Sequence, residues 1–353
     1  MLKLIAVAGL LAATACAATP AATNTPAAAQ VSAEWNAAAL AEVVAYVQSQ
    51  KTTGFLVIQD GKTIVEHNWP LPDDAGSQTF RANFVHGQAA GGALREDVAS
   101  QQKSLIALLV GVGVDKGLID IARPVSDYIG SRWSKATPEQ EGKITVRHLL
   151  EMNSGLKEDL SFDAPAGTKF FYNTPAYAKL KPVLEKASGQ DLGIVTQLWF
   201  TKVADMHSTG WEQRPAAFAD SGNPTGLVTT PGDLAIMGQI ILNRGRKSNG
   251  AQLISEAQFN AIFTPTATNP AYGRLWWLNS SDYSINVGAS PRREGRFIPA
   301  APADMLSALG AQDRKLFVVP SMKLIVVRTG QATPDREFNN TLWQKLMKAA
   351  PQH

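Results

Sequence analysis

One stretch, residues 100–117, reads SQQKSLIALLVGVGVDKG and joins a short polar start to a long apolar run. Residues 105–112 are almost wholly apolar and are good helix formers, so we expect a buried helix that begins near Ser100. Gly117 stands where a C-terminal helix cap belongs, which argues against a nucleotide-binding glycine loop at 111–117. The stretch therefore predicts a core helix whose first turn is polar.

Ser100 and Lys103 stand three residues apart at the start of this helix. That spacing puts both side chains on one helix face, so the lysine ammonium reaches the serine hydroxyl. A serine is a poor nucleophile until a base takes its proton, and a lysine in a dry cleft loses its charge readily. The pair is our candidate for a nucleophile and its proton-relay partner, although an isolated pair of this kind is more often a solvated helix face. The same spacing recurs in Ser154-Gly-Leu-Lys157, where the glycine predicts a helix end instead.

A second polar segment, residues 165–177, reads PAGTKFFYNTPAY. Turn residues lead into an aromatic cluster, and Tyr172-Asn173 precedes a helical pattern. A tyrosine phenol shuttles a proton if neighbouring cations lower its pKa, and an amide beside it orients a substrate. Tyr172 and Asn173 are therefore candidate site residues, and packing of the aromatic side chains in the core is the alternative interpretation.

Strand patterns lie at both ends of the chain, and helical patterns lie between them. The Asp60-Gly61 pair within the alternating segment 53–69 is a strong hairpin signal. Helices are expected at 33–47, 144–152, 178–186, 234–242, 255–262 and 337–347, strands at 275–278, 283–287, 305–309, 316–319 and 324–328, and an irregular segment at 70–93. This order predicts an α+β fold, in which N- and C-terminal segments share one antiparallel sheet flanked by helices and a mainly helical lobe is inserted. The predicted α/β lobe comprises residues 34–104 and 266–353, and the helical lobe comprises residues 105–265.

The N-terminal residues have the composition of an export signal followed by a tether. Residues 4–13 are apolar and follow the positive charge of Lys3, and the run is too short to span a bilayer. Cys16, the only cysteine, follows small residues in a pattern that resembles a bacterial lipobox, with ordinary signal cleavage as the alternative. Residues 16–33 are rich in Ala, Thr and Pro and predict a flexible linker. We expect a signal peptide at 1–15, a tether at 16–33, and a single catalytic domain at 34–353, in an exported, periplasmic protein that a lipid on Cys16 attaches to the membrane of a bacterium.

The composition excludes several classes of protein. The chain has 33 Lys+Arg against 30 Asp+Glu, and the basic residues are scattered, so we expect no nucleic-acid partner. A lone cysteine forms no internal disulfide, and neither it nor the histidines form a metal-binding pattern, so we expect no metal and no cofactor. The expected partner is a small-molecule substrate, and no oligomeric state is predicted.

Several segments in a fixed order resemble the serine β-lactamase and penicillin-binding superfamily. The similarity is to its class-C-like branch, with esterases, D-amino-acid peptidases and 6-aminohexanoate-dimer hydrolases, and it runs from about residue 40 to 345. It rests on Ser100-x-x-Lys103 and the helix after it, ITVRHLLEMNSGL at 144–156, PAGTKFFYNTPAY at 165–177, GLVTTPGDLAIMGQIILN at 226–243, YGRLWWLN at 272–279 and ALGAQDRKLFVVPSMKLIVVRTG at 308–330. The resemblance implies a β-lactamase/transpeptidase-like fold.

The resemblance also implies roles for individual residues. Ser100 matches the acylated nucleophile, Lys103 its proton-relay partner, and Tyr172 the general base or acid. Further candidates for oxyanion or substrate binding are Gly310, Ala311, Asn173 and Trp276. The amide of Ala311 is expected to be the second oxyanion donor beside that of Ser100. One of the adjacent tryptophans at 276–277 is expected to contact substrate, with core packing as the alternative.

Two departures from the family pattern bear on the substrate. Asn173 stands one place earlier than the family's Tyr-x-Asn requires, and Thr174 holds the usual Asn position. The third family box, commonly Lys or His, then Thr or Ser, then Gly, reads Ala308-Leu-Gly310 and lacks the groups that hold a β-lactam carboxylate. We therefore expect a serine hydrolase that cleaves an ester or amide bond through a Ser100 acyl-enzyme. One alternative is a β-lactamase or D-Ala-D-Ala carboxypeptidase, and the other is a non-catalytic cell-envelope binding or sensor protein on the same fold.

Overall fold

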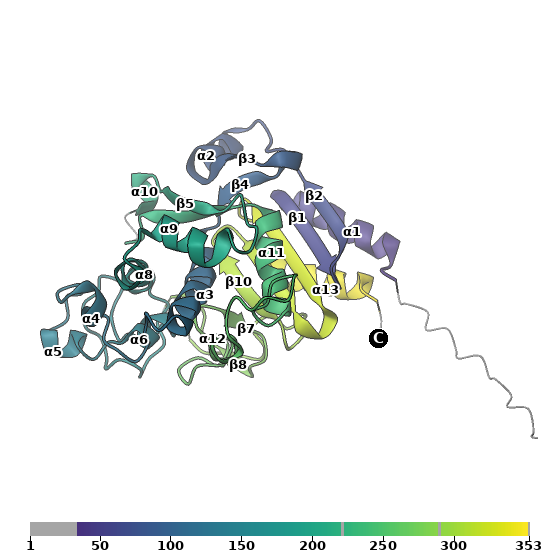
Figure 1. The fold of residues 1–353 in the computed structure, drawn as a ribbon. Coiled ribbons are helices and arrows are strands. Elements are labelled where there is room, and N and C mark those ends of the chain that lie inside the picture. The colour runs from purple at the N-terminus through teal and green to yellow at the C-terminus, as the bar shows by residue number, and fades with distance from the viewer. Residues whose placement is uncertain (1–33, 220–221, 289–290, 352–353) are drawn as a thin grey trace, which may run out of the picture.

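The computed structural model describes residues 34–219, 222–288 and 291–351, and its main feature is a six-stranded antiparallel sheet (Figure 1). The strand order is β2-β1-β12-β11-β10-β7. The strands are β1 (Thr52–Gln59), β2 (Lys62–Asn68), β7 (Trp277–Leu278), β10 (Leu306–Gly310), β11 (Arg314–Val319) and β12 (Leu324–Gly330). Strand β1 pairs with β12, with Val57 opposite Val326. The sheet is therefore shared by the two ends of the chain, and the predicted α+β fold is confirmed.

Helices cover both faces of this sheet. Successive side chains of a strand point to opposite faces, so Phe55 and Leu56 enter different cores. The core around Phe55 includes α1 (Ala37–Ser49) and α13 (Phe338–Ala349), and the core around Leu56 includes α3 (Gln102–Asp115) and α11 (Pro231–Leu242). Because both faces are buried, β11 and β12 contain continuous apolar runs, at 316–319 and 324–327, rather than alternating ones.

The β1–β2 hairpin turns at the predicted residues. Asp60 and Gly61 have φ values of 48° and 74°. Two consecutive positive φ angles are the requirement of the tight turn whose twist matches that of the flanking strands, and Asp-Gly meets it at low cost.

Helices are the main regular elements of the chain between the two halves of the sheet. This part of the chain contains α4 (Ser126–Ile129), α5 (Pro138–Glu141), α6 (Val146–Leu150), α7 (Thr174–Ala178), α8 (Leu180–Ser188), α9 (Leu192–Thr196), α10 (Ala216–Ala219) and α12 (Glu256–Ile262). It also contains the three-residue turns η1 (Ala90–Gly92) and η2 (Ala99–Gln101) and the π-helical turn η3 (Gln197–Thr201), while η4 (Pro320–Met322) lies between β11 and β12. The helices expected at 144–152, 178–186, 234–242 and 255–262 are present as α6, α8, α11 and α12. Gly117 follows α3 with a φ of 68°, as its capping position predicts.

A second sheet was not expected from the sequence. Its strands are β3 (Val85–Gln88), β4 (Leu94–Asp97), β6 (Thr225–Thr229) and β5 (Gly210–Gln213), in that spatial order. Helix α2 (Ala75–Phe84) and β3 lie in the segment that we expected to be irregular. Strands of four or five residues are too short for a clear alternation of apolar and polar side chains. This sheet matters for function because β4 runs directly into η2 and Ser100.

The β8 (Tyr283–Ser284) and β9 (Arg293–Glu294) segments form a separate two-stranded ribbon. Cys16, the expected signal peptide and the expected tether lie outside the described residues. In the ranges described, no helix is both long enough and apolar enough to cross a bilayer.

Candidate active site

Ser100 lies in η2, between β4 and the first turn of α3. The preceding residue, Ala99, has a φ of 50°, in the left-handed region that an alanine rarely adopts. Side chains on either side hold this backbone: the Ala99 N–H donates to Asp97 Oδ1 at 2.8 Å, and the Ala99 carbonyl accepts from Gln102 Nε2 at 3.0 Å. The local strain is therefore compensated by hydrogen bonds that fix the position of Ser100.

Lys103 lies one turn along from Ser100, as the three-residue spacing predicts. Its Nζ donates to Ser100 Oγ at 3.0 Å, and the residue is 1% exposed. Burial, with a smaller contribution from the positive charge of Arg214, lowers the pKa of Lys103 to about 7. Because a substantial fraction of the amine is neutral near that pH, Lys103 can accept a proton from the serine.

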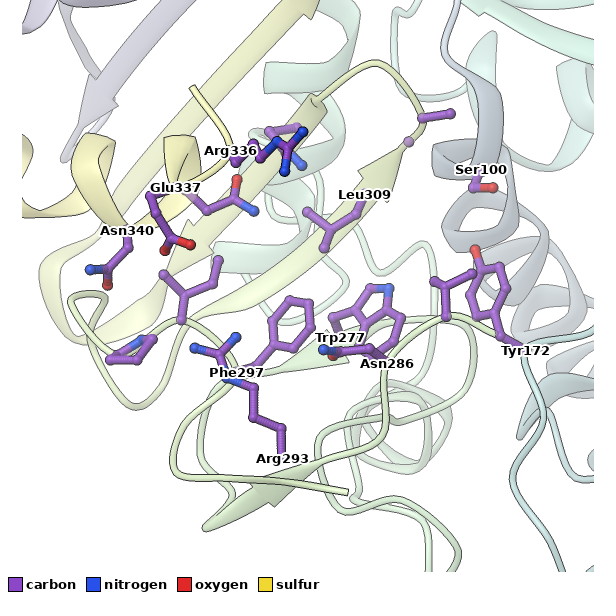
Figure 2. A pocket seen from close by; sticks show the side chains of 17 residues that line it. Ser100, Tyr172, Trp277, Asn286, Arg293, Phe297, Leu309, Arg336, Glu337 and Asn340 are labelled. Carbon is purple, nitrogen blue, oxygen red and sulfur yellow. The ribbon is translucent and has the colours of Figure 1, made fainter. Parts of the chain in front are cut away.

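Tyr172 completes the cluster from the loop before α7. Its hydroxyl is hydrogen-bonded to Ser100, and Figure 2 shows the two oxygens facing each other. The Lys103 Nζ lies 4.9 Å from the centre of the Tyr172 ring. Burial raises the pKa of Tyr172 to about 12, and the bond to Ser100 opposes this shift only in part. A lowered pKa would require neighbouring cations to outweigh the desolvation of the phenolate, and here desolvation dominates. Tyr172 therefore stays protonated at neutral pH.

One cavity of about 500 Å³ lies beside these groups (Figure 2). Ser100, Tyr172, Gly310 and Ala311 all line it. Strand β10 approaches the serine segment so closely that a Cβ on Gly310 would lie 2.2 Å from the carbonyl oxygen of Val98. Only glycine allows this approach, which brings the end of β10 to the edge of the cavity beside Ser100.

Asn173 does not line the cavity, contrary to its expected role in substrate binding. It is buried, its Oδ1 accepts from the Ala176 N–H at 2.9 Å, and its Nδ2 donates to the carbonyls of Leu156 and Lys157 at 2.9 Å each. These bonds cap α7 and join it to the neighbouring loop. Asn173 therefore holds the loop that presents Tyr172.

Trp276 is also placed elsewhere than we expected. It is fully buried, its Nε1 donates to the carbonyl of Ser104 at 3.2 Å, and its ring packs edge-on against Phe263. Core packing, the alternative interpretation, describes it correctly. Its neighbour Trp277 lines the cavity instead. Alternation along the strand separates the two side chains, but it does not tell which of them faces the cavity.

A layer of buried titratable side chains lies behind the cluster of Ser100, Lys103 and Tyr172. Arg214 binds both carboxylate oxygens of Asp97, at 2.7 and 2.9 Å. Lys181 is 6% exposed, and its Nζ donates to Asn223 Oδ1 and to both oxygens of Thr225. Burial, then the charges of Arg214 and Lys103, lowers the pKa of Lys181 to about 6. No sequence motif marks these residues, because their partners come from β4, β6 and two loops far apart in the chain.

A stack of aromatic rings runs from Tyr172 to Trp277, with centroids 6.0 Å apart, and from Trp277 to Phe297, with centroids 4.6 Å apart. No group of three or more His, Cys, Asp or Glu side chains that could hold a metal ion occurs among the residues described.

The chain is similar to known proteins in sequence and in fold. The family model described as Beta-lactamase matches residues 37–349. A curated but uncharacterized protein of Alkalihalophilus pseudofirmus is 27% identical over 257 residues, which is 65% of this chain and 72% of that protein.

Solved structures share the fold at lower identity. A putative β-lactamase from Bacteroides dorei has a TM-score of 0.68 and 14% identity, and the match covers 90% of this chain and all of that one. A putative 6-aminohexanoate-dimer hydrolase from Bacillus anthracis has a TM-score of 0.62 and 17% identity, over 86% of this chain and 80% of that one. At these identities the likeness concerns the fold alone.

Proposed function

The chain belongs to the beta-lactamase family of serine hydrolases, and from that premise we propose that it cleaves an ester or amide bond of a small molecule through a Ser100 acyl-enzyme. The observation that carries the proposal is the 3.0 Å contact between Lys103 Nζ and Ser100 Oγ. A lysine that is 1% exposed, with a pKa lowered to about 7, is a base suited to neutral pH.

In the first half of the reaction, Lys103 takes the proton of Ser100 while Oγ forms a bond to the carbonyl carbon. The resulting oxyanion is stabilised by the backbone amides of Ser100 and Ala311. Tyr172 then gives its proton to the leaving oxygen or nitrogen as the acyl bond breaks. A phenol with a pKa of about 12 is a stronger acid than an alkyl alcohol, so this transfer to an alkoxide is downhill. Lys103 returns the proton to Tyr172.

In the second half, water hydrolyses the acyl-enzyme. The same groups act in reverse: a base takes the proton of the water, and Ser100 leaves as its Oγ is reprotonated. In this double displacement Ser100 is the nucleophile, Lys103 the base and Tyr172 the acid. No step uses a cofactor.

A second candidate function, β-lactamase or D-Ala-D-Ala carboxypeptidase, is favoured by Lys315. Strand β11 places Lys315 opposite Leu309, and it lines the same cavity. The segment Ala308-Leu-Gly310 lacks the cation that would hold a β-lactam carboxylate, and Lys315 on the neighbouring strand could take its place. This candidate ranks second because Lys315 is already ion-paired with Asp313 at 3.2 Å.

The experiment that tests the proposal compares the protein with its Ser100→Ala variant. The wild type should hydrolyse a short-chain p-nitrophenyl ester and be labelled by a fluorophosphonate. Ser100→Ala should abolish labelling and lower kcat by about 10³-fold or more. Full turnover by Ser100→Ala would refute the assignment, and a wild type inert in both assays would favour the non-catalytic sensor. Rates with nitrocefin, a D-Ala-D-Ala peptide and a simple ester then rank the two candidate functions.

We also propose that residues 1–15 direct export and that Cys16 carries a lipid, because the only cysteine follows an apolar segment and small residues. Radioactive palmitate should label the wild type in a bacterial host and should not label Cys16→Ser. Equal labelling of both would reject the lipid at this position.

A further inference from the structure

The motif that contains the nucleophile reads Ser100-Gln101-Gln102-Lys103, and both of its glutamines are fully buried. Glutamine is mostly an exposed residue, and a buried amide costs stability unless its oxygen and nitrogen are both hydrogen-bonded. An apolar side chain is the ordinary choice for such positions. The catalytic steps proposed above use Ser100 and Lys103 and neither glutamine, so the two amides need a separate explanation.

Gln102 holds the peptide group that precedes the nucleophile. Its Nε2 donates to the Ala99 carbonyl at 3.0 Å, and its Oε1 accepts from the Tyr177 hydroxyl at 3.2 Å. The Ala99 carbonyl and the Ser100 N–H belong to one planar peptide group and point in opposite directions. Ala99 has a φ of 50°, which is unfavourable for alanine, so this peptide needs support to keep its orientation. A bond that fixes the carbonyl also fixes the direction of the Ser100 N–H.

Gln101 joins the same turn to strand β10. Its Nε2 donates to the Ala308 carbonyl at 3.2 Å, a bond between residues far apart in the chain. Ala308 lies three residues before Ala311, whose amide is the other proposed oxyanion donor. The bond therefore ties the strand that leads to one donor to the turn that contains the other, Ser100.

The other end of the Gln101 amide indicates that this residue does not serve stability. Its Oε1 is buried and forms no hydrogen bond with any residue described. A buried acceptor without a partner lowers stability, whereas an apolar side chain of similar shape avoids that cost. Such a group in a folded protein calls for an explanation in function, and the bond to Ala308 offers one.

We propose that Gln101 and Gln102 are positioning residues of the oxyanion hole: Gln102 orients the Ser100 N–H, and Gln101 sets the distance from it to the Ala311 N–H. Donors stabilise an oxyanion best when they are already fixed as the charge develops. Because the oxyanion exists only during the reaction, these bonds should affect kcat rather than substrate binding. The inference rests on the proposed function, since it requires Ser100 to attack a carbonyl.

Methionine variants of the full-length protein test the inference, because methionine has a similar length and lacks the amide. The substrates are p-nitrophenyl acetate and its thionoester, in which sulfur replaces the carbonyl oxygen. Both release p-nitrophenolate, but sulfur is a weak hydrogen-bond acceptor, so an intact oxyanion hole favours the ester. We expect Gln101→Met and Gln102→Met each to lower kcat for the ester by about tenfold at nearly constant KM, less than the loss of a whole donor costs. The ratio of ester to thionoester turnover should fall by a similar factor, and an unchanged ratio in both variants would overturn the inference.

Gln50→Met is the matched control. Gln50 is also buried, but its amide bonds to Ser49 and to the Asp335 N–H, and it does not line the cavity. This variant should lower the urea midpoint and keep the wild-type ratio of turnover. Gln101→Met should do the reverse, because it removes an acceptor that has no partner. If the ratio instead follows the midpoint in all the variants, the glutamines are structural and the inference is rejected.

Two further measurements keep the test decisive. Gln102→Met leaves the Tyr177 hydroxyl without its partner, so the double variant with Tyr177→Phe replaces it if the single one does not fold, with the same expected ratio. The acidic limb of the pH profile should stay at its wild-type position, because the bond from Lys103 to Ser100 is retained. A limb that moves in the glutamine variants would mean that they act through Lys103, which would overturn the inference.

The inference and the proposed function fail in different ways. Turnover that depends on Ser100, with a ratio unchanged in the glutamine variants, rejects the inference and leaves the proposed function intact. A wild type without Ser100-dependent turnover rejects the proposed function, and the inference with it, because no oxyanion then forms.

Discussion

At the scale of single residues, the environment of Lys103 explains why its amine is suited to the role of base that we propose. The groups that face it are Ser100, Tyr172, Tyr177 and, behind them, Arg214, Asp97 and Lys181. None of these is a carboxylate in contact with its amine. Burial therefore costs the ammonium more than its hydrogen bond to Ser100 returns.

This environment predicts the acidic limb of the pH profile. Since neutral Lys103 is the active form in the proposed mechanism, kcat/KM should rise with pH through about 7. Arg214→Gln removes a positive charge that disfavours the ammonium, so it should move the limb to higher pH and reduce activity below pH 7 severalfold. Arg214→Lys keeps the charge and should leave the limb near its wild-type position. A limb that does not move in Arg214→Gln would contradict this account of the lysine pKa.

Tyr172 carries a separate prediction, because its role as an acid depends on the leaving group. Tyr172→Phe should lower kcat for an alkyl ester by about 10²-fold or more, a usual cost of losing a general acid. Hydrolysis of a p-nitrophenyl ester should fall much less, because p-nitrophenolate leaves without a proton. Equal losses on both esters, measured at one pH, would mean that Tyr172 acts on the serine rather than on the leaving group.

At the scale of elements, the site depends on how closely β10 approaches η2. A Cβ on Gly310 would meet the Val98 carbonyl, so Gly310→Ala must push the strand away from the segment that holds Ser100. We expect kcat/KM to fall by about 10²-fold, as for other displacements of about 1 Å in an active site. Gly193→Ala in α9 is the control, because nothing lies within 4 Å of its Cβ position and helix propensity improves. If both variants keep wild-type activity, the close approach is not required for catalysis.

Sequence patterns predicted the elements whose signals are local. The Asp60-Gly61 hairpin, the apolar helix after Ser100 and the C-terminal strands each follow from residues near one another in the chain. The sequence allowed the cluster of Ser100, Lys103 and Tyr172 to be predicted for two reasons. Ser100 and Lys103 are one helical turn apart, and Tyr172 lies in a motif that resembles a known family. The four-stranded sheet, the pair of Asp97 with Arg214, and the choice of Trp277 over Trp276 depend on contacts between distant segments, which no local pattern encodes.

At the scale of the whole molecule, buried lysines and tyrosines set the dependence of stability on pH. Lys103 and Lys181 have pKa values of about 7 and about 6 when folded, below the 10.5 of an exposed lysine. Between those values the unfolded chain binds more protons than the folded one, so stability rises with pH, by at most about 1.4 kcal/mol per pH unit for each lysine. Burial raises the pKa of Tyr172, Tyr177 and Tyr272 above 10, so stability falls again once unfolded tyrosines ionise.

The urea midpoint measured at a series of pH values checks this prediction. It should increase from about pH 6 to a maximum between about pH 9 and 10 and then decrease. Lys181→Met removes one of the two lysines and should flatten the rising limb, whereas the same change at the exposed Lys323 should leave the slope unchanged. A midpoint that is flat or falls between pH 6 and 9 would contradict the lowered pKa values.

The pairing of β1 with β12 also determines when the central sheet can form during synthesis of the chain. The Asn36 N–H donates to the carbonyl of Ala349 at 2.9 Å, so the two ends of the described chain meet on one side of the sheet. The β1–β2 hairpin is synthesised early but finds its partner only after nearly the whole polypeptide has emerged, and such long-range contacts form slowly. The central sheet therefore cannot close while the chain is incomplete, and the edge of β1 that pairs with β12 stays without that partner until residues 324–330 have been made.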